Sequence, residues 1–191
     1  IMKKLLAIII LSLCFMLPSQ ADDIRDFQIE GISIGDSLLD YFDKNQINSR
    51  KKMFYLGDDN FHKINFYSKK SVYELINFHL KKNDNKFVVY SMAGRNIIEF
   101  NECLEIKKIA IKEVKDVLGV KSENNYISDY RKKYGKSFSN VTELKIKNGL
   151  VRIYCDNWSD KYTKKNNWKD SFNIAISSQE FINWLENKAY K

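Results

Sequence analysis

Serine, histidine and aspartate are the residue types that most often build a hydrolytic site, and the chain holds a serine in one suggestive pattern. Gly31-Ile32-Ser33-Ile34-Gly35 has the spacing of a nucleophile elbow, a tight turn that lifts a serine hydroxyl above an α/β-hydrolase sheet. Such an elbow needs preceding strands and an oxyanion-hole loop, and the segment from Asp22 to Gly31 is too short to provide them. We therefore expect an extended segment that ends in a glycine turn.

The next four residues, Gly35-Asp36-Ser37-Leu38, resemble the opening motif of the GDSL (SGNH) esterases. The resemblance implies that Ser37 is a nucleophile and that its base is a histidine from a D-x-x-H block near the C-terminus. The matching block here ends at His62, and no histidine follows His79. We interpret Ser37 as a helix cap after a glycine turn, and a serine esterase remains an alternative function.

Metal and cofactor chemistry is not indicated by the spacing of the possible ligands. His62 and His79 are the only histidines, and they do not have the short spacing that places two ligands on one helix face. The aspartates do not follow the pattern of a calcium loop. We expect no metal, no cofactor and no catalytic residue.

A polar, aromatic segment from Asp156 to Asp170 is the best candidate for a binding loop. It combines aromatic rings with lysines, and such rings stack on sugars or lie at lipid interfaces while ammonium groups attract phosphate. The alternative is that the rings fold back over the open end of a sheet with solvated lysines around them. The candidate binding residues are Trp158, Tyr162, Lys164, Lys165 and Trp168.

The first 21 residues predict an export signal. Lys3 and Lys4 precede an apolar run that is too short to span a bilayer, and small residues precede a cleavage point after Ala21. We expect residues 1–21 to be removed, residues 22–191 to form a single α+β domain without a transmembrane span, and the protein to be periplasmic or secreted.

Three cysteines are present, and Cys14 lies in the predicted signal. The remaining pair, Cys103 and Cys155, predicts one disulfide in an oxidising compartment. Closing a loop of about 50 residues stabilises a fold by roughly 4 kcal/mol on the chain-entropy model.

Removal of residues 1–21, which hold two of the 32 basic residues and none of the 24 acidic ones, lowers the net charge from +8 to +6. This modest excess favours anionic envelope components over nucleic acid, which is scarce outside the cytoplasm. An AT-rich genome would also produce this content of Lys, Asn, Ile and Tyr, so the charge alone does not identify a partner.

Hydrophobic periodicity predicts strands, two helices and a short helix after Ser37. A long helix begins near Asn101 and ends at Gly119, and a final helix follows Ser177, which forms a capping box with Glu180. Lys121 to Ser139 is interpreted as a frayed helix or mobile connection. The predicted strands are 61–67, 73–80, 87–94, 141–146, 150–155 and 172–176.

This order predicts an α+β fold with an antiparallel sheet of about six strands in two three-stranded units and helices packed on one face. The segments Asp22–Phe27 and Glu30–Phe42, together with Cys103 and Tyr154–Trp158, resemble small exported proteins of AT-rich marine alphaproteobacteria. That resemblance implies a periplasmic domain and no particular activity.

We therefore expect a non-enzymatic periplasmic protein that binds a partner protein or an envelope component. The alternatives are the esterase that uses Ser37 and a protein that binds a small solute such as a sugar or a lipid.

Overall fold

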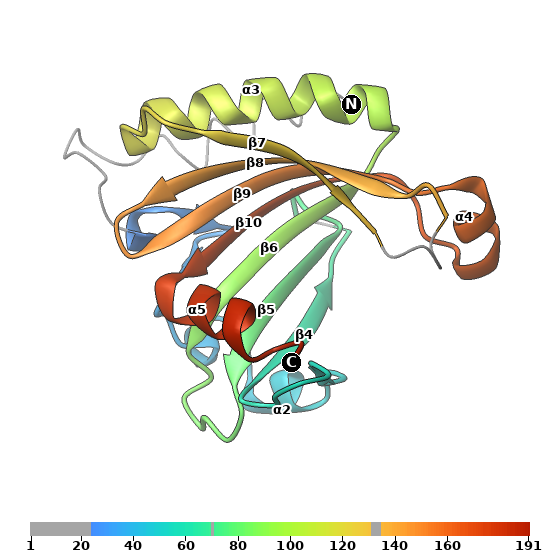
Figure 1. Cartoon of the computed structure of the whole chain (residues 1–191). Coiled ribbons are helices and arrows are strands. Elements are labelled where there is room, and N and C mark those ends of the chain that lie inside the picture. The colour runs from blue at the N-terminus through green and yellow to red at the C-terminus, as the bar shows by residue number, and fades with distance from the viewer. Residues whose placement is uncertain (1–23, 70, 131–134) are drawn as a thin grey trace.

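The computed structural model describes residues 24–69, 71–130 and 135–191 (Figure 1). The predicted signal peptide, with Cys14, lies outside the described residues. The helical elements are η1 (Ile24–Asp26), η2 (Leu38–Asp40), α2 (Lys44–Asn48), α3 (Phe100–Leu118), α4 (Asp160–Asn166) and α5 (Gln179–Asn187). The strands are β1 (Gln28–Ile29), β2 (Ile32–Ser33), β3 (Met53–Phe54), β4 (Phe61–Tyr67), β5 (Leu75–Lys81), β6 (Val89–Ile97), β7 (Asn124–Asp129), β8 (Phe138–Ile146), β9 (Gly149–Asn157) and β10 (Ser171–Ser178).

Eight of these strands form one antiparallel sheet in the order β3-β4-β5-β6-β10-β9-β8-β7. The hairpin-linked strands β4, β5 and β6 form one half, and β8, β9 and β10 lie together in the other. The halves meet where β6 pairs with β10 over seven residues, from Ser91 opposite Ser177 to Ile97 opposite Ser171. The predicted α+β class and antiparallel sheet are confirmed.

The predicted number of about six strands is too small, because eight strands form the main sheet and β1 pairs with β2 in a separate hairpin. Strand β7 occupies part of the segment interpreted as a frayed helix or mobile connection. All six of its side chains are exposed, so it lacks the alternation of buried and exposed residues that identifies a half-buried strand. Strand β3 has only two residues, too few to show any period.

The long helix α3 covers one face of the sheet, which we call the core face. Cys103, Ala110 and Val114 recur at helical spacing and are buried against β8, β9 and β10. Glu99 occupies the N-cap position, two residues before the predicted Asn101, and Gly119 ends the helix with a φ of 64°. The predicted disulfide is confirmed, since Cys103 is bonded to Cys155 on β9.

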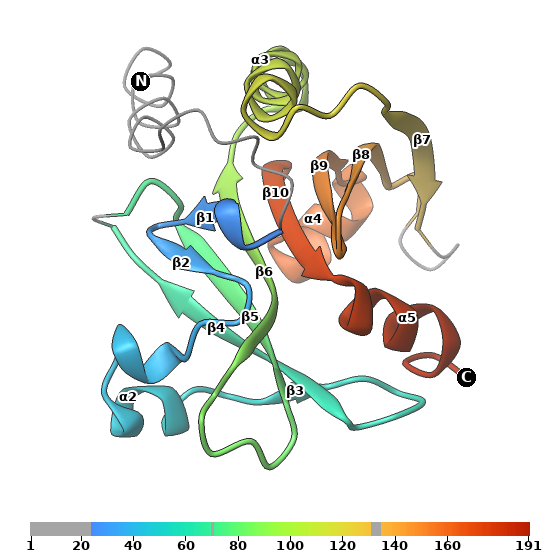
Figure 2. The same ribbon diagram turned by 90° about the vertical axis from the view of Figure 1, so that its left-hand side faces the viewer.

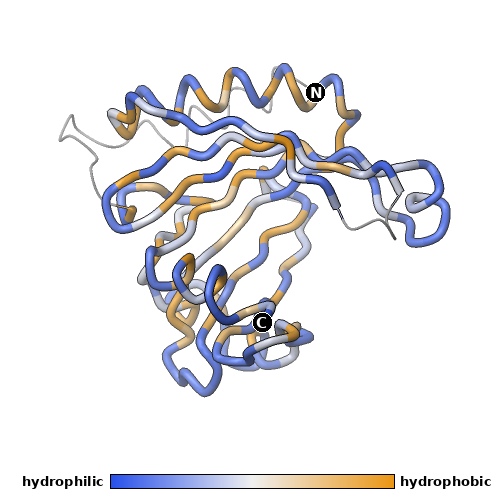
Figure 3. Tube along the Cα trace, in the orientation of Figure 1, coloured by the Kyte–Doolittle hydropathy of each residue, from blue (hydrophilic) through white to orange (hydrophobic). Residues whose placement is uncertain are grey.

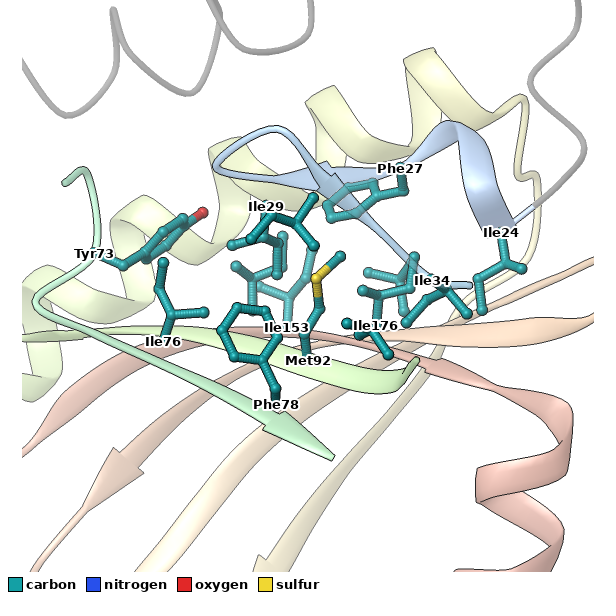
Figure 4. Close-up of a cluster of buried hydrophobic side chains, with 14 of the residues drawn as sticks. Ile24, Phe27, Ile29, Ile34, Tyr73, Ile76, Phe78, Met92, Ile153 and Ile176 are labelled. Atoms are coloured by element: carbon teal, nitrogen blue, oxygen red, sulfur yellow. The ribbon is translucent and has the colours of Figure 1, made fainter. Parts of the chain in front are cut away.

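The N-terminal segment also covers the core face, beside α3. Glu30 and Gly31 have positive φ angles and turn β1 back along β2. Ile29 and Ile34 pack with Met92 and Ile176 of the central strands (Figure 4). In Figure 3, hydrophobic and polar residues alternate along α3 and the strands. On β6, Met92 lies in the core, whereas Ser91 and Ala93 lie on the opposite face of the sheet.

The final helix, α5, lies on that opposite face (Figure 2). Its Phe181 and Trp184 pack against Phe61 of β4. Phe61 and Ile64 are three positions apart on this strand, so Phe61 lies on the face opposite the core-facing Ile64. The expectation that the helices pack on one face is therefore wrong. The N-cap of α5 is Ser178, whose hydroxyl accepts from the Phe181 backbone N–H, rather than the predicted Ser177.

The predicted hairpin at Asn148-Gly149 is present as β8–β9, with Ile146 paired to Gly149 around Lys147 and Asn148. Asn148 takes the positive φ of 65° that such a tight turn requires. Gly149 itself lies in β9, where an added Cβ would stand 2.5 Å from the carbonyl oxygen of Ser177. The glycine thus permits close packing rather than the turn.

Candidate binding hollow on the open sheet face

The sheet face opposite α3, which we call the open face, carries a hollow of about 480 Å³. Residues of β4, β5 and β6 line it on one side and residues of β7, β8 and β9 on the other. Helix α5 and the C-terminal turn border it with Phe181, Leu185 and Tyr190. This volume lies in the range of pockets that hold small organic molecules.

Small side chains form the floor of the hollow at the junction of the two halves of the sheet. On β6 and β10, Ser91 is opposite Ser177 and Ala93 is opposite Ala175. The next positions along each strand, including Met92 and Ile176, are fully buried on the core face. Alternation thus places large side chains on the core face and short ones on the open face, and the short side chains leave space there.

Tyrosines form much of the wall. The lining includes Tyr55, Tyr126, Tyr130, Tyr154 and Tyr190. Burial raises the pKa of Tyr55, Tyr130 and Tyr154 above the ordinary value, so these phenols stay neutral at physiological pH. Each presents an apolar ring together with a hydroxyl that can donate or accept a hydrogen bond.

The described lining residues include two cations, Lys63 and Arg152, and no carboxylate. Arg152 is paired with Glu143, at 2.7 Å between Nη2 and Oε1, and Tyr126 donates to the same carboxylate at 2.8 Å. Lys63 makes no ion pair or side-chain hydrogen bond with the described residues. Burial, and then the nearby Arg95, lowers the pKa of Lys63 below its ordinary value.

His79 lies opposite Lys63 in the β4–β5 register. Its ring packs against Phe181 with centroids 4.7 Å apart, and its buried Nδ1 has no hydrogen-bond partner among the described residues. Burial, with a smaller effect from Lys63, lowers the pKa of His79 to about 3. The imidazole is therefore neutral at physiological pH, and the positive charge on this wall belongs to Lys63.

A buried carboxylate holds one wall of the hollow in place. Asp156 is 6% exposed and accepts hydrogen bonds from Tyr130 at 2.9 Å and from Ser139 at 2.5 Å. Ser171 and Asn173 donate to its other oxygen at 3.3 and 3.2 Å. Four donors satisfy the buried carboxylate, and the network fixes the lining residues Tyr130 and Ser139.

The residues of the predicted binding loop gather at the end of this network. The segment contains the helix α4, which the sequence interpretation described only as a loop. Trp158 is 7% exposed and stacks between Tyr130, at 4.5 Å, and Tyr162, at 5.4 Å. The ring of Trp168 meets Trp158 edge-on at 4.5 Å. The rings therefore pack on one another at the end of the sheet.

Only part of the predicted loop remains available to a ligand. Trp168 is 43% exposed and lines a smaller hollow of about 180 Å³ with Tyr67 and Arg95. Lys164 and Lys165 are exposed in the last turn of α4 and do not line either hollow. The candidate lysines and Trp168, which the sequence groups together, therefore do not line one common hollow.

The serine motifs hold structural hydrogen bonds. Ser37 caps η2, since its hydroxyl accepts from the Leu39 N–H at 3.1 Å and donates to the Lys86 carbonyl at 2.6 Å. Ser33 is buried and donates to the Arg25 carbonyl. His62 is 3% exposed, and burial lowers its pKa to about 4. Within the described part of the chain, no three His, Cys, Asp or Glu side chains group as metal ligands.

The hollow was missed at the sequence level because its floor consists of serine and alanine, which are common in any strand. The available signal is a large side chain between two small ones, which occurs on two strands. These triplets are Ser91-Met92-Ala93 and Ala175-Ile176-Ser177. That signal acquires meaning only when β6 and β10 are known to be neighbours.

Comparisons of the chain with protein-family models, with curated proteins and with solved structures found no match. None of the helices in the described ranges has the length and apolar character needed to cross a membrane.

Proposed function

We propose that this is a non-enzymatic periplasmic protein that binds a small solute of the envelope in the hollow of the open face. The observation that carries the proposal is the hollow itself, with a floor of short side chains between walls of tyrosine and charged residues. The buried Asp156 network holds Tyr130 in place on one wall and so helps to keep the shape of the hollow. The disulfide, together with the export signal that the sequence predicts, supports placement in an oxidising compartment.

A fluorescent probe of suitable size tests the proposal. N-phenyl-1-naphthylamine is neutral, carries two aromatic units and fluoresces strongly in apolar surroundings. We expect saturable binding of one probe per chain and loss of that binding in Ala175→Leu, because leucine fills the floor between β6 and β9. Leu39→Ala, an exposed position in η2, is the matched control. Absence of binding, or equal binding by Ala175→Leu, would contradict the proposal.

The esterase alternative rests on Ser37, and the cap geometry of that residue favours a structural role. Ser37→Ala should lower the free energy of unfolding by about 1 kcal/mol, the usual effect of removing a helix cap. It should leave any hydrolysis of 4-nitrophenyl acetate by the purified protein unchanged. Loss of hydrolysis in a folded Ser37→Ala protein would instead support the esterase.

A partner protein is the second candidate, and the edge strand β7 favours it. No described strand pairs with its outer edge, and Ile127 is 54% exposed there. An incoming strand could extend the sheet at this position. Crosslinking from a benzoyl-phenylalanine residue at position 127 in the native envelope tests this idea. A crosslink to one protein would support it, and a pattern equal to that from exposed position 56 would oppose it.

A further inference from the structure

Resting on the proposed function, we infer that the solute is an organic acid with a single negative charge, whose anionic group pairs with Lys63 while its apolar body covers the floor of the hollow. Arg152 is already neutralised by Glu143, whereas Lys63 has no counter-ion or hydrogen-bond acceptor among the described residues.

Lys63 is only partly solvated, because it lies on the open face between β3 and β5, opposite Met53 on one side and His79 on the other. A half-buried ammonium without a partner costs free energy in the folded protein. An anionic ligand beside Lys63 would offset part of that cost, because a charge-assisted hydrogen bond would replace incomplete hydration. The buried Nδ1 of His79, which has no hydrogen-bond partner among the described residues, lies on the same wall.

The charges that line the hollow favour a monoanion such as a carboxylate over a phosphate monoester. Lys63 is the one described lining cation without a carboxylate partner, because Arg95 lines the neighbouring hollow and donates to the Lys169 carbonyl. A phosphate monoester would bring about two negative charges to this single ammonium. Lysine also contacts an anion as a point charge, without the forked geometry by which arginine binds phosphate. The described lining offers no negative charge that would repel the acid.

The shape of the remaining lining fits the apolar part of such a molecule. From Lys63 the floor continues through Ser91 and Ala93 to Ala175, and Phe181 borders it. Tyrosine hydroxyls on the far wall can bond polar groups in the middle of the ligand. One ammonium beside an apolar floor favours an amphipathic acid over a free inorganic anion. An inorganic anion would leave most of the hollow empty.

Two probes that differ by one sulfonate separate this inference from the proposed function. They are N-phenyl-1-naphthylamine, which is neutral, and 8-anilinonaphthalene-1-sulfonate, which has the same rings and one negative charge. We expect the sulfonate to bind the full chain about tenfold more tightly, the size of one charge-assisted hydrogen bond. Lys63→Met should remove this advantage and leave the affinity for the neutral probe within about twofold.

Matched variants guard against a general effect of charge. Lys112→Met removes an exposed lysine from α3, on the core face, and should not change the affinity for either probe. Lys63→Arg keeps the charge and should keep part of the preference. The inference is overturned if the neutral probe binds in the hollow and the sulfonate probe binds no more tightly. It is also overturned if Lys63→Met and Lys112→Met have the same effect on the affinity for the sulfonate probe. In both cases the proposed function stands. If neither probe binds, the proposed function fails first.

Competition then identifies the headgroup. Decanoate should displace the bound sulfonate probe at lower concentration than 1-decanol, and at lower concentration than decyl phosphate. Displacement by decyl phosphate in preference to decanoate would overturn the assignment of a carboxylate, and equal displacement by all three would overturn the assignment of an anion.

Discussion

The hydroxyl oxygens of Ser91 and Ser177 lie 2.7 Å apart, on the two strands where the halves of the sheet meet. The flanking residues Met92 and Ile176 point to the opposite face and are fully buried. At this junction the side chains on the core face are therefore large and apolar, whereas those on the open face are small and hydrogen-bonded. This difference makes the open face hollow.

The serine pair should behave as one unit. Ser91→Ala and Ser177→Ala should each lower the free energy of unfolding by about 1 kcal/mol, because each removes the same hydrogen bond. The double variant should lose about as much as either single variant, and urea denaturation of all four proteins measures the coupling. Additive losses would show that the two hydroxyls do not depend on each other.

Lys63→Met should stabilise the unliganded protein, on the order of 1 kcal/mol, because it removes a poorly solvated charge without a partner. The folded-state pKa of Lys63 is below its ordinary value, so the charged form destabilises the fold at neutral pH. Thermal denaturation at pH 7 measures the change in stability. Lys112→Met is the control, and its change should be near zero. A clear loss of stability in Lys63→Met would mean that the ammonium has a stabilising partner after all.

The two histidines should make the protein less stable in mild acid. Their folded-state pKa values, about 4 for His62 and about 3 for His79, lie below the unfolded value of about 6.5. Between these values the unfolded chain binds protons that the folded chain does not, so stability falls as the pH falls from about 6.5. At pH 5 the loss is about 2 kcal/mol for each histidine.

Urea denaturation at pH 7.5 and pH 5 tests this dependence, in a range where most carboxylates stay ionised. His62→Leu and His79→Leu should each remove about half of the difference in stability between the two pH values. Equal stability of the wild-type protein at both values would contradict the burial of neutral imidazoles.

Loss of the disulfide should cost about 4 kcal/mol, because Cys103 and Cys155 are separated by 52 residues in sequence and the bond restricts the unfolded chain. The variant with both cysteines replaced by alanine should show this loss in guanidinium denaturation. Wild-type protein that is unfolded and refolded in a reducing agent should have the same free energy of unfolding as the variant. Two free thiols in protein purified without a reducing agent would show that this disulfide does not form.

Much of the fold follows from local patterns. The alternation in Phe61–Tyr67 marks β4 with the bounds that the structure shows, and the helical spacing from Cys103 to Val114 marks α3. The pairing of Cys103 with Cys155 follows from the number of cysteines left after the predicted signal. These features depend on neighbours in sequence or on simple counting, so the sequence contains them.

The remaining features depend on contacts between distant segments. An amphipathic helix such as α5 shows which of its sides is buried, but not which face of the sheet it covers. Strand β7 is exposed along its whole length and is held by its pairing with β8. The hollow depends on β6 and β10 lying side by side, although Ser91 and Ser177 are 86 residues apart in sequence.

A crystal structure of the full chain with 8-anilinonaphthalene-1-sulfonate tests the binding hollow most directly. We expect the rings of the probe over Ala93 and Ala175, and a sulfonate oxygen at hydrogen-bond distance from Lys63 Nζ. A probe seated beside Trp168 or on the core face, with the hollow filled only by water, would contradict this expectation.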